Sequence, residues 1–129
     1  MNLCVIPARG GSKRIKHKNI KTFNGKPIIA YSIEAALKSK CFSKVIVSTD
    51  DNEIAEVAEK FGAQVPFVRP SSLSNDFAGT IPVIKHAINW MEDNNNKFDN
   101  VCCLYATAPF IRSDIISKAY EQLLKSKKD

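Results

Sequence analysis

Metal-binding spacings of cysteine and histidine are absent from this sequence. Its 129 residues include four cysteines and two histidines, and no two cysteines show CxxC spacing. Cys102 and Cys103 are adjacent, so on a strand their side chains would point to opposite faces. A zinc site would also need histidines, and His17 and His86 are poorly placed to complete one. We therefore expect free thiols in a reducing cytoplasm.

Long apolar runs are also absent. The longest unbroken run is about as long as one strand, which excludes a membrane-spanning helix. Residues 1–8 lack the basic start and long apolar middle of a signal peptide, so we expect a cytoplasmic protein without membrane contacts. With 44% apolar and 25% charged residues, and no repeat or linker, the chain has the composition of one soluble domain.

Acidic residues are missing from the first 33 positions. This segment contains seven of the 19 basic residues, whereas the first acid is Glu34. The net charge of +6 therefore arises at one end of the sequence. Nucleic-acid-binding proteins usually spread basic residues over a face, together with aromatic residues. The single tryptophan, Trp90, lies in a segment with the pattern of a buried helix. We therefore expect a compact anionic ligand and no nucleic acid.

Strand and helix patterns alternate along the chain. Apolar runs predict strands at residues 2–6, 44–48, 64–68 and 101–105, and helical spacing predicts helices at about 28–37, 52–61, 81–93 and 113–126. This alternation predicts an α/β fold with a mainly parallel sheet and helices on both faces. Ligands of such sheets bind beyond the carboxyl ends of the strands, where residues 7–19, 69–80 and 106–112 form the loops.

The first of these loops has the composition of a phosphate-binding loop. Gly10 and Gly11 follow a buried strand and can turn tightly, exposing N–H groups to an anion. Arg9, Lys13 and Lys18 add positive charge, and arginine can bind phosphate through two parallel hydrogen bonds. The pattern is neither a P-loop nor GxGxxG. It predicts a polyanion-binding loop, with a solvated basic surface loop as the alternative.

Residues 6–13, Ile-Pro-Ala-Arg-Gly-Gly-Ser-Lys, followed by Lys18 and Asn19, resemble the nucleotide-binding signature of the acylneuraminate cytidylyltransferase family. These enzymes make CMP-activated nonulosonic acids. The resemblance extends along essentially the whole chain, through residues 25–27, 47–50, 61–63, 69–70, 76–80 and 107–109. It implies a Rossmann-like nucleotidyltransferase fold and transfer of CMP from CTP to a sugar hydroxyl, with release of pyrophosphate. The product would serve surface glycan or flagellin glycosylation.

The same resemblance implies roles for individual residues. Arg9 would position the triphosphate, and Lys18 would stabilise charge on the α-phosphate in the transition state. The implied nucleotide-binding residues are Ala8, Arg9, Gly10, Gly11, Ser12, Lys13, Lys18, Asn19, Arg69, Ala78 and Thr80.

Residues 104–110 indicate which sugar the enzyme would use. The stretch Leu-Tyr-Ala-Thr-Ala-Pro-Phe resembles the pseudaminic acid cytidylyltransferase branch, and Tyr105 stands where the sialic acid enzymes commonly have glutamine. Tyr105 and Thr107 are therefore the expected sugar-binding residues. Pseudaminic acid is favoured over N-acetylneuraminic or legionaminic acid, and a transferase for Kdo is a further alternative.

The length of the chain limits what the resemblance implies. Family members are considerably longer, and their metal-binding aspartate pair lies in the later half. We therefore expect Mg²⁺ as cofactor, with its ligands outside this chain, and a homodimer for the complete protein. Residues 1–129 are interpreted as the nucleotide-binding portion of a cytidylyltransferase domain, truncated on its C-terminal side. Alone it would bind CTP weakly and catalyse poorly. A non-catalytic nucleotide-binding module is the alternative function.

Several of these residues also have a purely structural interpretation. Asp50 and Asp51 could form a catalytic carboxylate pair, but capping of the following helix is the favoured interpretation. Arg69 could be an ordinary surface arginine, Thr80 a helix cap, and Tyr105 a core aromatic at the end of a strand.

Overall fold

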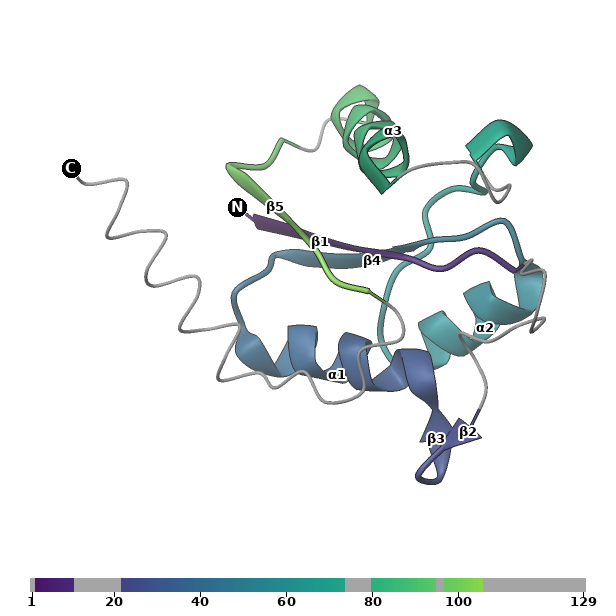
Figure 1. Ribbon diagram of the computed structural model, residues 1–129. Helices are drawn as coiled ribbons and strands as arrows, with labels where there is room; N and C mark the ends of the chain where they lie inside the picture. The colour runs from purple at the N-terminus through teal and green to yellow at the C-terminus, as the bar shows by residue number, and fades with distance from the viewer. Residues whose placement is uncertain (1, 11–21, 74–79, 95–96, 106–129) are drawn as a thin grey trace.

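Three parallel strands form the central sheet of the computed structural model, which describes residues 2–10, 22–73, 80–94 and 97–105 (Figure 1). The strands are β1 (Asn2–Pro7), β4 (Lys44–Ser48) and β5 (Asn100–Cys103), in the order β4-β1-β5. In the β1–β4 register, Pro7 lies opposite Ser48. Because all three strands run in the same direction, their carboxyl ends share one edge, called here the carboxyl edge.

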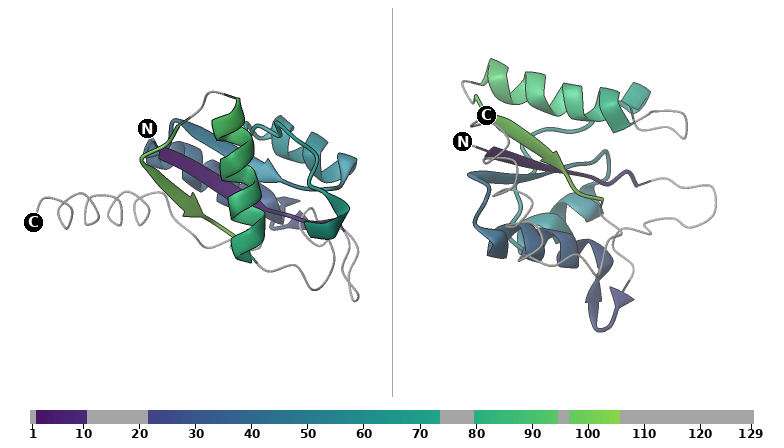
Figure 2. Two further views of the ribbon diagram at one scale, coloured as in Figure 1. Left: turned by 90° about the horizontal axis from the view of Figure 1, so that it is seen from above. Right: turned by 60° about the vertical axis from the view of Figure 1, so that its left-hand side comes forward.

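Helices cover both faces of the sheet (Figures 1 and 2). They are α1 (Ile28–Ser39), α2 (Asn52–Lys60) and α3 (Thr80–Asp93). Successive β1 side chains point to opposite faces, so Cys4 and Ile6 pack in the core beneath α1 and α2. Leu3 and Val5 pack in the core beneath α3. The predicted α/β fold with helices on both faces is confirmed.

The prediction of a strand at residues 64–68 is wrong. Gln64 forms an isolated parallel bridge to Ile46, and residues 65–68 are not strand. Pro66 has no N–H to donate to a neighbouring strand, which explains why pairing does not continue. Phe67 is buried in the core beneath α3. Residues 65–68 are therefore an irregular connection that passes beside β4, from the core beneath α1 and α2 to the core beneath α3.

A short hairpin that sequence analysis did not predict precedes α1. It consists of β2 (Thr22–Phe23) and β3 (Lys26–Pro27), joined by Asn24 and Gly25. Both turn residues have positive φ, 49° and 90°, as a two-residue hairpin turn of this kind requires. Pro27 consequently precedes α1, where the sequence had placed it inside the first turn.

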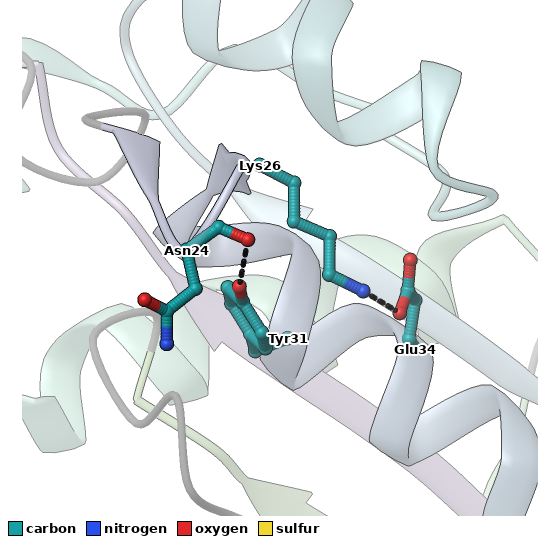
Figure 3. A network of polar contacts seen from close by, with 4 residues as sticks. All are labelled: Asn24, Lys26, Tyr31 and Glu34. Atoms are coloured by element: carbon teal, nitrogen blue, oxygen red, sulfur yellow. Dashed lines mark hydrogen bonds and ion pairs between the residues drawn. The ribbon is translucent and has the colours of Figure 1, made fainter.

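Polar contacts fasten this hairpin to α1 (Figure 3). Lys26 forms an ion pair with Glu34, and the Tyr31 hydroxyl donates a hydrogen bond to the carbonyl oxygen of Asn24 at 3.3 Å. The Lys26 Nζ also lies 4.7 Å from the centroid of the Tyr31 ring. The chain that follows the first loop is thus held at a fixed place on α1.

The remaining boundaries differ little from the predicted ones. A short 3₁₀ helix, η2 (Ser71–Leu73), follows Arg69, and β5 ends at Cys103, before the predicted strand end at Tyr105. The helix predicted at 113–126 lies outside the described residues. All four cysteines are free thiols. Among the described helices, none is long and apolar enough to cross a membrane.

The start of α2 is fixed by a side-chain cap. Asp51 Oδ1 accepts hydrogen bonds from the backbone N–H groups of Glu53 at 2.9 Å and Ile54 at 3.0 Å. These N–H groups would otherwise have no partner within the helix. The structure thus confirms that Asp51 is the capping residue.

We predict that Asp51→Ala lowers the free energy of unfolding by about 1 kcal/mol, because the cap is lost. Urea unfolding followed by circular dichroism measures this loss. Glu56→Ala is the matched control, since Glu56 is an exposed acid on the same helix and its replacement should change stability by less than about 0.5 kcal/mol. Equal stability of the two variants would show that the cap contributes nothing.

Candidate nucleotide-binding site

Residues that follow β1, β4 and β5 meet at the carboxyl edge (Figure 1). The Ala8 N–H donates to the Ser48 carbonyl oxygen at 2.9 Å, so β1 stays beside β4 beyond its last residue. On the other side of β1, the Leu104 N–H donates to the Val5 carbonyl oxygen at 3.1 Å. The start of the glycine-rich loop is therefore placed between the residues that follow β4 and β5.

Gly10 lies directly against the acidic pair that follows β4. Its N–H donates to Asp50 Oδ1 at 2.8 Å. A Cβ at this position would stand 2.7 Å from both Cβ and Oδ2 of Asp51, which is closer than real contacts allow. Only glycine fits here without a shift of the Asp51 backbone. Asp50 and Asp51 therefore both contact Gly10 at the start of the first loop, and Asp51 also caps α2.

Arg69 is buried beside β4, with 4% of its surface exposed. Its guanidinium donates to Ser48 Oγ at 3.1 Å, to the Ser48 carbonyl oxygen at 2.6 Å and to the Leu73 carbonyl oxygen at 3.2 Å. The backbone N–H of Arg69 donates to the Thr49 carbonyl oxygen at 2.9 Å. The interpretation of Arg69 as a surface arginine is wrong. Arg69 connects η2 to the end of β4.

Electrostatic interactions join Arg69 to the other charged residues at this edge. Burial lowers the pKa of Arg69 below its usual range. The nearby carboxylate of Asp50 opposes this shift, whereas the positive charge of Arg9 adds to it. Asp50 and Arg9 therefore each lie close enough to Arg69 at the carboxyl edge to influence its charge.

Tyr105 lies just beyond β5, and its position is set from α1. The fully buried Ser32 donates a hydrogen bond from Oγ to the Tyr105 carbonyl oxygen at 2.7 Å. The Tyr105 side chain itself is 61% exposed. The interpretation of Tyr105 as a core aromatic is therefore wrong. Its ring is accessible from solvent near the carboxyl edge.

The structure thus places four of the predicted nucleotide-binding residues, Ala8, Arg9, Gly10 and Arg69, at one edge of the sheet, with Tyr105 close to it. Thr80 begins α3, one residue before the predicted start, and its side chain lies outside the described residues. The other predicted nucleotide-binding residues lie outside the described residues: Gly11, Ser12, Lys13, Lys18, Asn19 and Ala78. Thr107, predicted to bind the sugar, also lies outside them.

The described acidic residues do not fit a metal site. Within residues 2–10, 22–73, 80–94 and 97–105, no three His, Cys, Asp or Glu side chains gather to hold an ion. The two carboxylates nearest the loop already have partners, since Asp50 binds the Gly10 amide and Asp51 caps α2. None of the described residues is therefore assigned as a Mg²⁺ ligand.

Three polar residues build this edge in ways that the sequence did not predict: Ser32 and Ser48 were not expected at the site, and Asp50 was expected only as part of a carboxylate pair or as a helix cap. Ser48 accepts from Arg69, Asp50 accepts from Gly10, and Ser32 supports Tyr105. Ser48 is the last residue of β4 and Asp50 follows two residues later, so the polar run at this strand end could have indicated their roles. Ser32 lies within the apolar stripe of α1, where a hydroxyl needs a partner once it is buried.

The sequence is similar to those of known cytidylyltransferases. A family model described as "Cytidylyltransferase" matches residues 3–129. The chain is 54% identical over 125 residues to the pseudaminic acid cytidylyltransferase of Campylobacter jejuni, covering 97% of this chain and 54% of the relative. It is 41% identical over 119 residues to the CMP-N,N′-diacetyllegionaminic acid synthase of Legionella pneumophila, covering 92% of this chain and 51% of the relative.

Solved structures show the same fold. A structure of CMP:2-keto-3-deoxy-manno-octonic acid synthetase complexed with CTP matches with a TM-score of 0.77 and 26% identity, over 96% of this chain and 47% of that one. The chain thus spans about half the length of the curated relatives it matches. The resemblance drawn from the motifs is confirmed. On the match of the family model and of these relatives, the chain belongs to the cytidylyltransferase family.

Proposed function

We propose that this protein transfers CMP from CTP to a nonulosonic acid and releases pyrophosphate, and that residues 1–129 supply its nucleotide-binding portion. The main support for this proposal is the 54% identity to a pseudaminic acid cytidylyltransferase over 97% of the chain. The carboxyl edge supports it, because Arg9, Gly10 and Arg69 meet where sheets of this kind bind ligands.

Pseudaminic acid is the proposed sugar. Identity to the pseudaminic acid relative is 54%, against 41% to the legionaminic acid relative. The sequence at residues 104–110 favours the same branch, and we assign sugar contacts to Tyr105 and Thr107. A role in surface glycan or flagellin glycosylation, a cytoplasmic location and a homodimeric state of the complete protein stay predictions.

The chemistry requires positive charge more than it requires a nucleophile on the protein. The anomeric hydroxyl of the sugar attacks the α-phosphorus, a new P–O bond forms, and the bond to the β-phosphate oxygen breaks. The hydroxyl proton is lost, and pyrophosphate leaves with the accumulated negative charge. Fixed cationic donors stabilise such transition states. We assign Arg9 to positioning the triphosphate and Lys18 to charge on the α-phosphate.

We predict that the chain binds CTP and that Arg9→Ala weakens binding about tenfold or more, because one charge-assisted hydrogen-bonding group is lost. Isothermal titration calorimetry with CTP measures the dissociation constant. Lys21→Ala is the matched control, since it removes the same charge from a position outside the signature. Equal losses of CTP affinity in the two variants would show that Arg9 contributes only its positive charge and no specific contact with the triphosphate.

Turnover is tested on the complete protein, of which residues 1–129 are the proposed nucleotide-binding portion, by pyrophosphate release from CTP in the presence of MgCl₂ and pseudaminic acid. We predict faster release with pseudaminic acid than with N-acetylneuraminic acid, and a rate about 100-fold lower for Lys18→Ala. Unchanged turnover in Lys18→Ala would remove Lys18 from the chemistry. CTP binding without pyrophosphate release would favour the non-catalytic nucleotide-binding module.

Replacing Tyr105 should change the choice of sugar. We predict that Tyr105→Gln lowers kcat/KM for pseudaminic acid relative to N-acetylneuraminic acid about tenfold, because it alters a contact that distinguishes the two branches. The KM for CTP serves as the internal control and should stay unchanged. A variant whose ratio of the two sugars equals that of the parent protein would exclude Tyr105 from sugar selection.

A further inference from the structure

An acidic side chain stands at the edge where we propose that a triphosphate binds. Asp50 is the second residue after β4, and its side chain is exposed. A carboxylate beside a polyanion repels it, so Asp50 by itself disfavours CTP binding. Because Asp50 by itself would weaken CTP binding, we expect it to have a structural role in the site that compensates for this repulsion.

The contact with Gly10 supplies such a role. Asp50 Oδ1 accepts the Gly10 N–H at 2.8 Å, at the point where the chain leaves β1 and enters the glycine-rich loop. The first two residues beyond β1 are Ala8 and Arg9, so this bond fixes the backbone immediately after Arg9. The position of Gly10, at the start of the loop, is thereby set by a residue that follows β4.

The support behind this bond is rigid. A Cβ on Gly10 would stand 2.7 Å from the Asp51 Cβ, so the loop backbone packs against the backbone-proximal part of Asp51. Asp51 in turn is held by its hydrogen bonds to the Glu53 and Ile54 amides at the start of α2. Gly10 is therefore pressed against the capped end of a helix, and Asp50 holds it there.

Neighbouring arginines reduce the electrostatic cost of this carboxylate. Burial lowers the pKa of Arg69, Asp50 acts to raise it and Arg9 acts to lower it, so Asp50 and Arg9 each lie within electrostatic reach of Arg69. The two guanidinium groups offset the negative charge that Asp50 brings to the edge. Its acceptor oxygen can then hold the loop while the edge as a whole stays positive.

We propose that Asp50 is a positioning residue for CTP binding, acting through its hydrogen bond to the Gly10 amide. The bond holds the start of the glycine-rich loop, and with it Arg9, in the arrangement that receives the phosphates. This inference rests on the proposed function, because it presumes that CTP binds at the carboxyl edge.

Two substitutions separate the acceptor from the charge. Asp50→Asn keeps an oxygen acceptor and removes the charge, whereas Asp50→Ala removes both. Simple charge repulsion predicts tighter CTP binding in both variants. The positioning role predicts that Asp50→Ala binds CTP about tenfold more weakly, while Asp50→Asn binds as well as the parent chain or better. Calorimetric titration of the full chain with CTP measures this, and Glu56→Gln controls for loss of one acid elsewhere.

The state of the Gly10 amide gives a readout that does not depend on CTP. Amide hydrogen exchange followed by NMR should show faster exchange of the Gly10 N–H in Asp50→Ala and parent-like exchange in Asp50→Asn. Gly10→Ala disturbs the same contact from the other side and should weaken CTP binding in the same direction.

The outcomes distinguish the two hypotheses. A parent chain that does not bind CTP contradicts the proposed function. In that case, amide exchange of the Gly10 N–H still tests whether Asp50 holds Gly10 in place. Unchanged Gly10 exchange in Asp50→Ala overturns the inference, and so does unchanged CTP affinity in a folded Asp50→Ala chain. Weaker binding in Asp50→Ala with parent-like binding in Asp50→Asn supports it.

Discussion

Parallel pairing of β1 with β4 is the constraint on which the rest of the structure depends. The register sets Pro7 beside Ser48, so the residues that follow the two strands emerge side by side. Gly10 can reach Asp50 only because of this register. A shift by one residue would also exchange the faces of every β1 side chain, moving Cys4 and Ile6 away from α1 and α2. Packing of the two cores and geometry of the site are therefore set by the same pairing.

Polar side chains at the carboxyl edge mostly bind other parts of the protein. Arg69 joins η2 to β4, Asp51 caps α2, and Ser32 holds the backbone of Tyr105. These contacts fix the residues around the first loop before any ligand arrives. A site arranged in advance loses less conformational entropy on binding, which favours affinity for a small charged ligand. The exposed ring of Tyr105 and the guanidinium of Arg9 stand within this fixed frame.

The sequence predicted well those features that depend on local pattern. Continuous apolar runs predicted β1 and β4, and the alternation of strand and helix patterns along the chain predicted helices on both faces of the sheet. The acidic pair before residue 52 predicted the start of α2. It failed where one residue outweighed the pattern, as Pro66 does in the expected strand at 64–68. The Asn24–Gly25 turn was also missed, although this dipeptide is a strong hairpin signal. Long-range contacts such as Ser32 with Tyr105 have no local signature, because the partners are 73 residues apart.

We propose that this chain binds CTP at the carboxyl edge of β4-β1-β5. An NMR titration of the ¹⁵N-labelled chain with CTP tests it most directly. Binding at this edge predicts saturable shift changes at the amides of Ala8, Gly10 and Asp50, with little change at Asn2 and Asn100 at the opposite ends of their strands. Saturable changes confined to the opposite edge, or the absence of saturable changes at millimolar CTP, would contradict it.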